Sequence, residues 1–429
     1  LGCAVEKISY KAAAAAYTPL ARQIQALQKQ KKPIPPQLVQ SFRTAQAELQ
    51  NRQKEYQTIA APIAEEMKAA EKVQIAETPF KSFFLRYPNI MNSAELALII
   101  IAGIAMMIFK DKVEAAIPGS KVRVYVSASL YKNSEAIEAM TEGNLEMAWG
   151  QFGKTAMVDP WTNVLLGPMR LTTAGAINAL DDFESFKVVK KRFNDVHDVT
   201  IFGSAHLSFY MGAGAGFRLL SPDDFKGKKI RSMGPAENAM LRAFGANPTT
   251  MAFGDVPPAL QTKVIDGLLT SLGGWNKVKE NAPFYSIAGI NGIVGDYYYI
   301  AGSNKWWAKL KPKHQKTIGK ILVDEVLPWA KRANYCNDKR LIDKYETKDP
   351  SKPGIYIMTK AESAALGKKL GNATSDWIKE NTPAAANKWV DKFAEEAKAA
   401  VAANPPGSSW LEKTDCAALE PIFQKYTKK

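Results

Sequence analysis

The sequence has few of the residues on which most enzymes and metal proteins depend. Its 429 residues include only three cysteines and three histidines. Cys3, Cys336 and Cys416 lie far apart, the histidines are isolated, and no pair has the spacing of metal ligands. Folding can still assemble a nucleophile with its base, but no local motif indicates one. We therefore expect no metal, no cofactor and no enzymatic activity.

The sequence also lacks a hydrophobic run long enough to span a membrane. A transmembrane helix needs roughly 20 apolar residues, whereas the longest run, LALIIIAGIAMMIF, covers residues 96–109. Asn92 and Ser93 precede it and can cap a helix, and a lysine-rich KDK follows. The run predicts a helix that is buried nearly all round. A helix that packs against a partner is the alternative.

Acidic residues are outnumbered by basic ones. The chain has 57 Lys and Arg against 42 Asp and Glu, a formal net charge of +15. Such a balance can attract nucleic acid, anionic membranes or anionic ligands. The basic runs are short, however, and no RNA-binding or zinc motif accompanies them. We expect no nucleic-acid partner and a solvated basic surface that attracts anions at long range.

The first residues, LGCAVEK, resemble the last part of a bacterial lipobox. Lipidation of Cys3, with a periplasmic or other extracytoplasmic location and a membrane anchor, is one interpretation. An ordinary cysteine near an N-terminus is the other. Exported proteins sit in an oxidising compartment. If Cys3 is lipidated, Cys336 and Cys416 remain as a pair that can form a disulfide.

Residues 1–78 differ from the rest of the chain, because they are rich in Ala, Gln, Lys and Glu and nearly lack aromatics and glycine. Strong helix formers flank the segment KKPIPP, which predicts a helical hairpin. The hairpin can pack on its own domain, dimerise or bind a partner. Apolar residues recur at helical spacing in both halves, at Leu20, Ile24 and Leu27 and at Leu38, Phe42, Ala45 and Leu49.

From residue 79 onward, strand and helix patterns alternate, which predicts an α/β fold with mostly parallel sheets. Two helices end at Gly143 and Gly245, and residues 316–343 predict one long helix. The expected strands include FKSFFLRYP, KVRVYVSA, LEMAWGQF, VTIFGSAHLSFYMGAG and KGKKIRSMG.

The segment AFGANPTTMAFGDVPPALQTKVIDG, residues 243–267, has unusual turn chemistry. We expect ANPTT to form a turn and Phe253 to reach a strand end. Asp255 should cap a helix that stops at Gly267, with prolines in its first turn. A strand and a loop should then lead to Thr270 and Trp275. Ligands bind outside the carboxyl ends of strands in such folds, so this segment is a pocket wall or, alternatively, ordinary core.

The segments SPDDFKGKKIRSMG and LRAFGANPTTMAFGDVPPALQTKVIDG closely resemble the solute-binding proteins of tripartite ATP-independent periplasmic (TRAP) transporters, the C4-dicarboxylate-binding family. The family pattern looks like TPEDLKGLKIRV followed by ALGANPTPMAFGEVYTALQTGVVDG. SASLYKNSEAIEAMTEGNLEMAWG and YYYIAGSNKWWAKLKPKHQKTI also match, so the resemblance covers roughly residues 80–393.

The resemblance implies a two-lobed periplasmic-binding-protein-like fold, type II-like, with long C-terminal helices. Residues 79–205 would form lobe I and residues 206–300 lobe II with crossing strands. Residues 301–429 would supply the hinge, the long helix, the return to lobe I and a tail. The implied function is extracytoplasmic capture of a small organic carboxylate and its delivery to the TRAP permease subunits in the membrane. The alternative is a structural or assembly lipoprotein that reuses this fold and makes oligomer contacts through its N-terminal helices.

The resemblance also implies a site. Arg231 matches the arginine that pairs with the substrate carboxylate, and a guanidinium can bind a carboxylate with two parallel hydrogen bonds. Phe253 matches the pocket phenylalanine of the family. The full candidate set is Arg231, Phe253, Thr270, Tyr210, Trp275, Trp149, Gln151 and Asn92, although each aromatic taken singly is more often core.

Two departures from the family pattern bear on the ligand. The second arginine of many members falls at Phe209 or Tyr210 here. The family's DGQENP reads DGLLTS, which puts Thr270 near the position of a substrate-binding asparagine. Because a second cation is missing at these positions, we expect a monocarboxylate with an apolar or aromatic body rather than a dicarboxylate or sialic acid.

Overall fold

The computed structural model describes residues 35–42, 44–48, 51, 97–125, 130–131, 135–206, 208–290 and 292–427. The chain divides into two units, Leu1–Asn89 and Ile90–Lys429. In the first unit, residues 36–42, 44–48 and 51 are helical, as expected for the second helix of the predicted hairpin. The first hairpin helix, the strand expected at residues 80–88, Cys3 and Asn92 lie outside the described residues.

Two sheets form the framework of the second unit. Lobe I contains a three-stranded sheet of order β1-β8-β2, and lobe II a six-stranded sheet of order β5-β4-β6-β3-β7-β9. The strands are β1 (Met147–Gln151), β2 (Val199–Ala205), β3 (Gly212–Ala215), β4 (Lys229–Ser232), β5 (Asn247–Thr250), β6 (Gly267–Thr270), β7 (Phe284–Ile287), β8 (Tyr298–Ser303) and β9 (Gly354–Ile357).

The two sheets are joined by chain segments that cross from one lobe to the other. Residues 206–211 lead from β2 to β3, and residues 288–297 lead from β7 to β8. In the larger sheet β4 is parallel to β5 and β6, and β7 is parallel to β9, so this sheet is mainly parallel as predicted. The antiparallel pairs all involve β3 or β8, the strands that follow the crossings.

Helices cover both sheets, and the two predicted glycine caps are present, whereas Asp255 precedes the helix Val256–Gln261 without a side-chain capping hydrogen bond. Gly143 and Gly245 adopt positive φ values after α5 and α10, which is why glycine ends those helices. The α-helices are α4 (Ala97–Ala116), α5 (Ala136–Glu142), α6 (Phe152–Thr155), α7 (Ala174–Asn178), α8 (Glu184–His197), α9 (Pro222–Phe225), α10 (Pro235–Ala243), α11 (Val256–Gln261), α12 (Leu272–Val278), α13 (Asn304–Trp307), α14 (Pro312–Lys320), α15 (Leu327–Tyr345), α16 (Lys360–Leu370), α17 (Ala373–Asn381), α18 (Asn387–Ala403) and α19 (Glu420–Thr427). Short 3₁₀ segments are η3 (Pro160–Leu165), η4 (Ala179–Asp182), η5 (Phe253–Asp255), η7 (Ala384–Ala386) and η8 (Ala417–Leu419).

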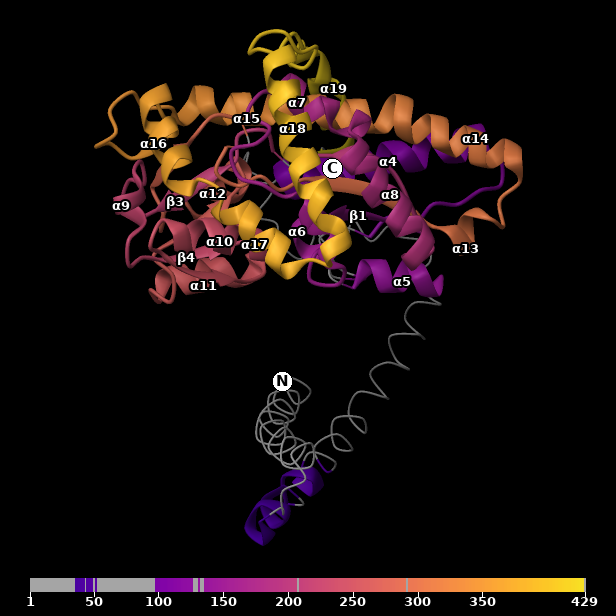
Figure 1. The fold of residues 1–429 in the computed structure, drawn as a ribbon. Helices are drawn as coiled ribbons and strands as arrows, with labels where there is room; N and C mark the ends of the chain where they lie inside the picture. Colours follow the sequence, from indigo (N-terminus) through magenta and orange to yellow (C-terminus); the bar gives the residue numbers. More distant parts are fainter. Residues whose placement is uncertain are drawn as a thin grey trace. The chain divides into compact units, whose positions relative to one another are not determined.

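The long helix expected over residues 316–343 is present and longer than predicted. The π-helical segment η6 (Ile321–Val326) joins α14 to α15 without a break. Pro328 stands in the first turn of α15, where its ring and missing N–H disturb the regular hydrogen bonding of the preceding turn. Figure 1 shows this helical stretch crossing the domain from the side of α16 to the side of α13.

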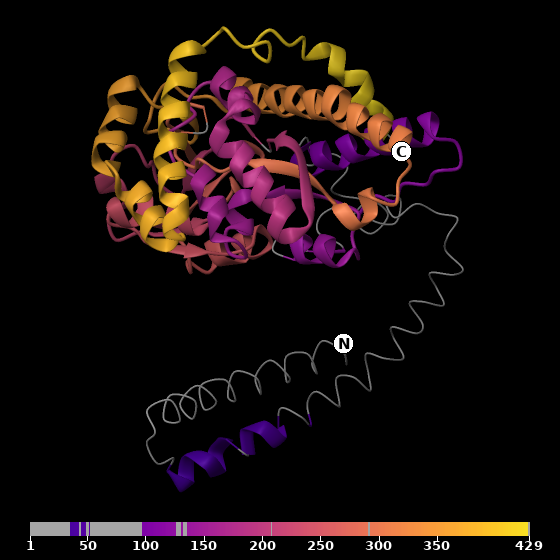
Figure 2. The same ribbon diagram turned by 45° about the vertical axis from the view of Figure 1, so that its right-hand side comes forward.

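The apolar helix α4 is buried as predicted. One cluster of buried side chains joins it to the long helix and to β8, and side chains of α19 pack on the same cluster. Figure 2 shows the ribbon of α19 near α4 and the long helix. The members from α4 are Ile101, Ile104, Ala105, Ile108, Phe109 and Val113. Among the described residues, no helix combines the length and the apolar character that a membrane crossing requires.

Several local predictions were wrong. ANPTT forms strand β5 rather than a turn, because residues 247–250 pair with β4. Gly267 begins β6 rather than ending α11, which stops earlier at Gln261. Residues 272–278 form α12 instead of a loop. Of the strand expected at residues 121–128, the described part (residues 121–125) has no strand pairing.

Candidate ligand-binding site

The carboxyl ends of three parallel strands lie side by side at one edge of the lobe II sheet. Arg231 is the penultimate residue of β4, which pairs with β5 on one side and β6 on the other. Ligands in open α/β sheets bind outside the carboxyl ends of strands. The three strand ends at this edge are Ser232, Thr250 and Thr270.

Arg231 is buried, with 3% of its surface exposed. Its Nε and Nη2 donate to the carbonyl of Met251 at 3.2 and 3.0 Å, and its Nη1 donates to the carbonyl of Leu269 at 2.9 Å. The ring centroid of Phe253 lies 6.0 Å from the guanidinium carbon. Burial lowers the pKa of Arg231, but a guanidinium remains charged. The carbonyl groups fix the orientation of the guanidinium, but they carry no net charge that would neutralise it.

A second cation, Lys154, lies in the electrostatic environment of Arg231. Lys154 belongs to α6, which follows β1 directly, and its side chain is partly buried. Burial and then the charge of Arg231 lower the pKa of Lys154, while Glu237 and Asp296 act in the opposite direction. Among the described residues Lys154 takes part in no salt bridge, so its charge is only partly compensated.

Two buried carboxyl groups, from different lobes, complete the cluster. Glu237 on α10 and Asp296 just before β8 are 3% and 4% exposed. Glu237 Oε2 accepts the backbone N–H of Met233 at 2.6 Å, whereas Oε1 is buried and has no hydrogen-bond partner among the described residues. Burial raises the pKa of both carboxyls, and the charge of Asp296 raises that of Glu237 further. The two carboxyl groups therefore bind a proton more readily than free carboxyl groups do.

Asp296 is held firmly by lobe I. Its Oδ1 accepts the backbone N–H groups of Gly153 and Tyr297 at 3.0 and 2.7 Å, and its Oδ2 accepts Gln151 Nε2 at 2.8 Å. A Cβ at Gly153 would lie 2.3 Å from Asp296 Oδ2, so only glycine allows this approach. The Gln151 side chain therefore positions Asp296 at the end of β1.

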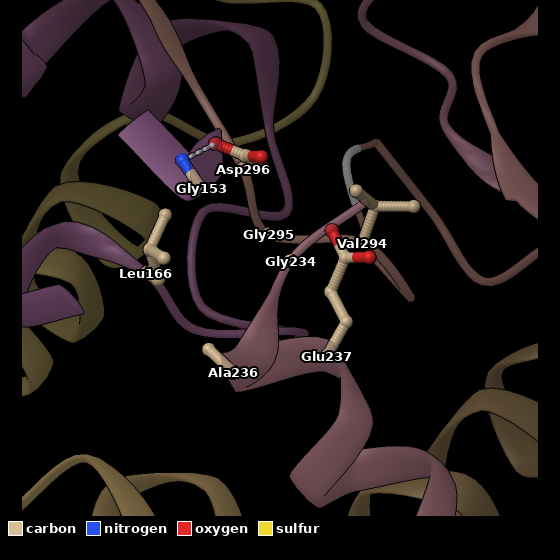
Figure 3. A pocket seen from close by; sticks show the side chains of 8 residues that line it. All are labelled: Gly153, Leu166, Gly234, Ala236, Glu237, Val294, Gly295 and Asp296. Carbon is tan, nitrogen blue, oxygen red and sulfur yellow. Dashed lines mark hydrogen bonds between the residues drawn. The ribbon is translucent and has the colours of Figure 1, made fainter. Parts of the chain in front are cut away.

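A narrow gap, too small to admit a water molecule, lies between the two carboxyl-bearing segments. Figure 3 shows Glu237 rising from the start of α10 toward Val294, with Asp296 and Gly153 on the opposite side. Arg231 and Lys154 are not among the residues that line this gap. The lining residues are Gly153, Leu166, Gly234, Ala236, Glu237, Val294, Gly295 and Asp296.

The structure brings several predicted residues together around Arg231. Phe253 lies on η5 rather than at a strand end, yet its ring is near the guanidinium. Thr270 is buried at the end of β6. A Cβ added at Gly274 would approach both Thr270 Oγ1, at 2.3 Å, and the Phe253 ring, at 3.2 Å, so these two side chains lie on the same side of that turn.

Three predicted aromatic residues are engaged elsewhere. Trp275 is in the lobe II core, where its indole N–H donates to the carbonyl of Ala282 at 2.7 Å. The Tyr210 ring lies 6.5 Å from that of Tyr335 on the long helix. Trp149 packs against the cluster that contains α4, and its buried indole N–H has no partner among the described residues. These positions do not place the three rings beside Arg231.

Cys336 and Cys416 form a disulfide. Cys336 lies on α15, and Cys416 immediately precedes η8 and α19. The bond thus attaches the C-terminal helix to the long helix. A disulfide is typical of proteins that fold outside the cytoplasm.

Sequence reasoning missed Lys154, Glu237 and Asp296. Lys154 and Asp296 had a weak signal, since each stands directly after a glycine, whereas no sequence pattern singled out Glu237. Asp296 is the clearest case, because it lies between apolar Val294 and a run of tyrosines in VGDYYY. A single acid in such a run indicates a buried carboxyl that needs partners.

Two α/β lobes joined by crossing segments and spanned by a long helix are the architecture of a two-lobed solute-binding protein. The chain belongs to the bacterial extracellular solute-binding proteins of family 7, whose DctP model matches residues 100–381. Membership places it among the extracytoplasmic binding proteins of transporters rather than among enzymes, as the sequence predicted.

Relatives and solved structures agree with this assignment. The chain is 26% identical over 232 residues to the C4-dicarboxylate-binding periplasmic protein DctP of Vibrio cholerae, covering 51% of this chain and 66% of that protein. It is 29% identical over 175 residues to the ectoine-binding periplasmic protein TeaA of Halomonas elongata, covering 38% of this chain and 50% of that one. The chain thus matches half to about two thirds of the length of these relatives.

The solved structures show the same fold. The sugar acid binding protein DctPAm from Advenella mimigardefordensis, in complex with galactonate, superposes with a TM-score of 0.61 at 17% identity, covering 70% of this chain and 94% of that one. A TRAP periplasmic solute-binding protein from Shewanella oneidensis with bound succinate gives 0.59 at 21% identity, covering 69% and 94%. The two-lobed fold predicted from the sequence is confirmed.

Proposed function

We propose that this protein captures a small organic carboxylate outside the cytoplasm and delivers it to a TRAP-type permease in the membrane. The observation that carries the proposal is the state of Arg231. Its guanidinium is buried at the carboxyl ends of parallel strands and is held by carbonyl groups alone. Among the described residues no carboxylate forms a salt bridge with it, and the charge of Glu237 only partly offsets its burial. A ligand carboxylate would supply a directly hydrogen-bonded opposite charge.

The proposed partners follow from the relatives. Proteins of the same fold were solved as TRAP periplasmic solute-binding proteins with succinate or sugar acids bound. The preference for a monocarboxylate stays a prediction, which was inferred from the lack of a second cation at Phe209, Tyr210 and Thr270. Lys154 supplies a cation from α6, a segment that the family pattern did not single out.

Thermal unfolding with a panel of organic acids tests the proposed function. A ligand that binds only the folded state raises its stability by mass action, so at least one acid should raise the unfolding temperature. Arg231→Ala should abolish that rise. Arg218→Ala is the matched control, because Arg218 also donates to backbone carbonyls but lies beside β7 and β9. No rise with any acid, or a rise that survives in Arg231→Ala, would contradict the proposal.

Two finer proposals concern the N-terminal part of the chain. We propose that Cys3 carries lipid and that residues 1–78 contact another copy or a partner. Mass spectrometry of the N-terminal peptide from membrane fractions tests lipidation. Light scattering of the chain with and without residues 4–78 tests assembly, and an unchanged monomer would contradict it.

A further inference from the structure

One exposed stretch of the chain carries lysines and no acid. Residues 308–320, AKLKPKHQKTIGK, contain five lysines and no Asp or Glu. They lead from the end of α13 through α14, which Figure 1 shows beside α4. All five residues are exposed, and among the described residues none of them takes part in a salt bridge. The five are Lys309, Lys311, Lys313, Lys316 and Lys320.

Packing beneath this stretch holds the lysines on one side. Leu310 and Ile318 turn inward and pack with the buried cluster that contains α4. In α14, Lys313, Lys316 and Lys320 are three and four residues apart, a spacing that places them on one face of the helix. Ile318 lies on the opposite face. The charges are therefore carried by a fixed, folded surface.

The acids of the neighbouring helical segments do not neutralise these lysines. Each acid of α4 and η6, apart from exposed Asp324, pairs with a lysine outside the stretch. Asp324 lies one turn beyond Lys320, where the run of lysines ends. The positive potential of this face is therefore not cancelled locally. The pairs are Lys110 with Glu114, Lys112 with Glu325, and Lys425 with Asp111.

We propose that these five lysines form a basic face that docks the protein on an anionic phospholipid membrane. Such docking would concentrate a binding protein at the surface in which its permease lies. The inference goes beyond the proposed function, because neither Arg231 nor the captured acid takes part in it. Either can fail without the other.

The chemistry of the basic face favours a membrane over a single bound anion. All five cations are lysines, and a lysine acts as a point charge, whereas arginine supplies the planar fork that grips one phosphate or carboxylate. Lysines spread along a helix and the segment before it suit a surface whose charge is distributed over many headgroups. Each lysine near such a surface should raise the affinity by about fivefold.

The same face lacks the features of a protein interface. The centre of such an interface is apolar and rich in aromatic side chains, and lysine is depleted there. In this stretch the large apolar side chains, Leu310 and Ile318, point into the core. Only lysines and small residues such as Ala308 and Pro312 are fully exposed. An acidic protein surface is therefore the less favoured occupant.

Sedimentation with lipid vesicles tests the proposal on the full chain. The protein should bind vesicles that contain phosphatidylglycerol and phosphatidylcholine, and it should not bind vesicles of phosphatidylcholine alone. Binding should weaken as salt is added, because at physiological ionic strength exposed charges are screened beyond about 8 Å. No binding to the anionic vesicles at low salt, or equal binding to both kinds, would overturn the proposal.

A triple variant assigns the binding to the basic face. Replacing Lys313, Lys316 and Lys320 together with glutamine should weaken binding to the anionic vesicles by about 10-fold or more. Glutamine is a good helix former, so the unfolding temperature should change little. The matched control alters the net charge equally on α16, and an equal loss of binding in both variants would overturn the assignment to this face. The control substitutions are Lys360→Gln, Lys368→Gln and Lys369→Gln.

Competition with soluble poly-glutamate separates a membrane from an acidic protein. At an equal concentration of negative charge, poly-glutamate should leave the protein on the vesicles, because a flexible polymer loses conformational entropy when it aligns with a fixed face. Release from the vesicles would mean that the face fits an acidic protein, and the membrane assignment would be wrong. The triple variant should keep the wild-type thermal response to organic acids, which separates this test from that of the proposed function.

Discussion

Asp338 on the long helix α15 holds the crossing segment between the lobes. Its Oδ2 accepts the backbone N–H of Phe209 at 2.6 Å, and it also accepts Ser208 Oγ at 2.8 Å and the Tyr210 N–H at 3.2 Å. The carboxyl is fully buried, and Oδ1 has no partner among the described residues. One acidic side chain thus fixes the chain direction where it passes from β2 in lobe I to β3 in lobe II.

This arrangement predicts a pH-dependent contribution to stability. Burial raises the pKa of Asp338 to about 7, although the hydrogen bonds it accepts oppose the shift. The folded carboxyl therefore keeps its proton up to about pH 7, while the unfolded one loses it near 3.8. Between about pH 4 and pH 7 the folded state binds more protons than the unfolded state. The stabilising contribution of Asp338 is therefore fully present below about pH 4 and declines as the pH rises to about 7.

Asp338→Asn should remove this dependence. The asparagine carbonyl can still accept the three hydrogen bonds, and its amide carries no charge at any of these pH values. Urea unfolding at pH 5, 6, 7 and 8 should show the variant gaining stability relative to the wild type as pH rises, by a few kcal/mol at most. Asp343→Asn, on the exposed side of the same helix, should show a much smaller change. A constant difference between wild type and Asp338→Asn across the range would rule out this role.

The fold was predictable because its signals are local. Glycine at Gly143 and Gly245 fixes where two helices end, and Pro257 and Pro258 stand in the first turn of α11 as predicted. Strand β5 was missed because Pro248 and its neighbours have the composition of a turn. It forms because β4 offers a partner, and proline is tolerated there because β5 is an edge strand.

The site was only half predictable, for a physical reason. Arg231 could be found because it lies in a continuous motif. Lys154, Glu237 and Asp296 come from α6, α10 and a crossing segment, and they meet only when the lobes fold against each other. Trp275 shows the opposite case, since its sequence position is beside the site but its ring faces the core.

The disulfide predicts a stabilised C-terminal helix. Cys336 and Cys416 are 80 residues apart, and closing a loop of that length stabilises a fold by about 4 kcal/mol. Reduction should therefore lower the unfolding temperature. It should also change Trp329 fluorescence, because Trp329 packs on Phe423 of α19 with ring centroids 5.8 Å apart.

Cys416→Ser provides the control for reduction. The variant should unfold at the temperature of the reduced wild type, and a reducing agent should have no further effect on it. If reduction lowers the unfolding temperature of Cys416→Ser as much as that of the wild type, the effect has another source.

Gly153→Ala should damage the site through a single methyl group. The new Cβ would lie 2.3 Å from Asp296 Oδ2, so the carboxylate must move away from the Gly153 N–H that it accepts at 3.0 Å. We expect a lower unfolding temperature and weaker binding of whichever acid stabilises the wild type.

Gly319→Ala is the matched substitution. Gly319 lies in α14 with no atom within 4 Å of the added Cβ, so alanine should stabilise the helix by about 0.5–1 kcal/mol and leave ligand affinity unchanged. Opposite effects of the two glycine substitutions on stability, measured by urea unfolding, would show that contact with Asp296 causes the damage at Gly153. A Gly153→Ala variant that matches the wild type in both stability and affinity would mean that the Gly153 and Asp296 segments can move apart without loss. The contact between Gly153 and Asp296 would then not be needed for the site.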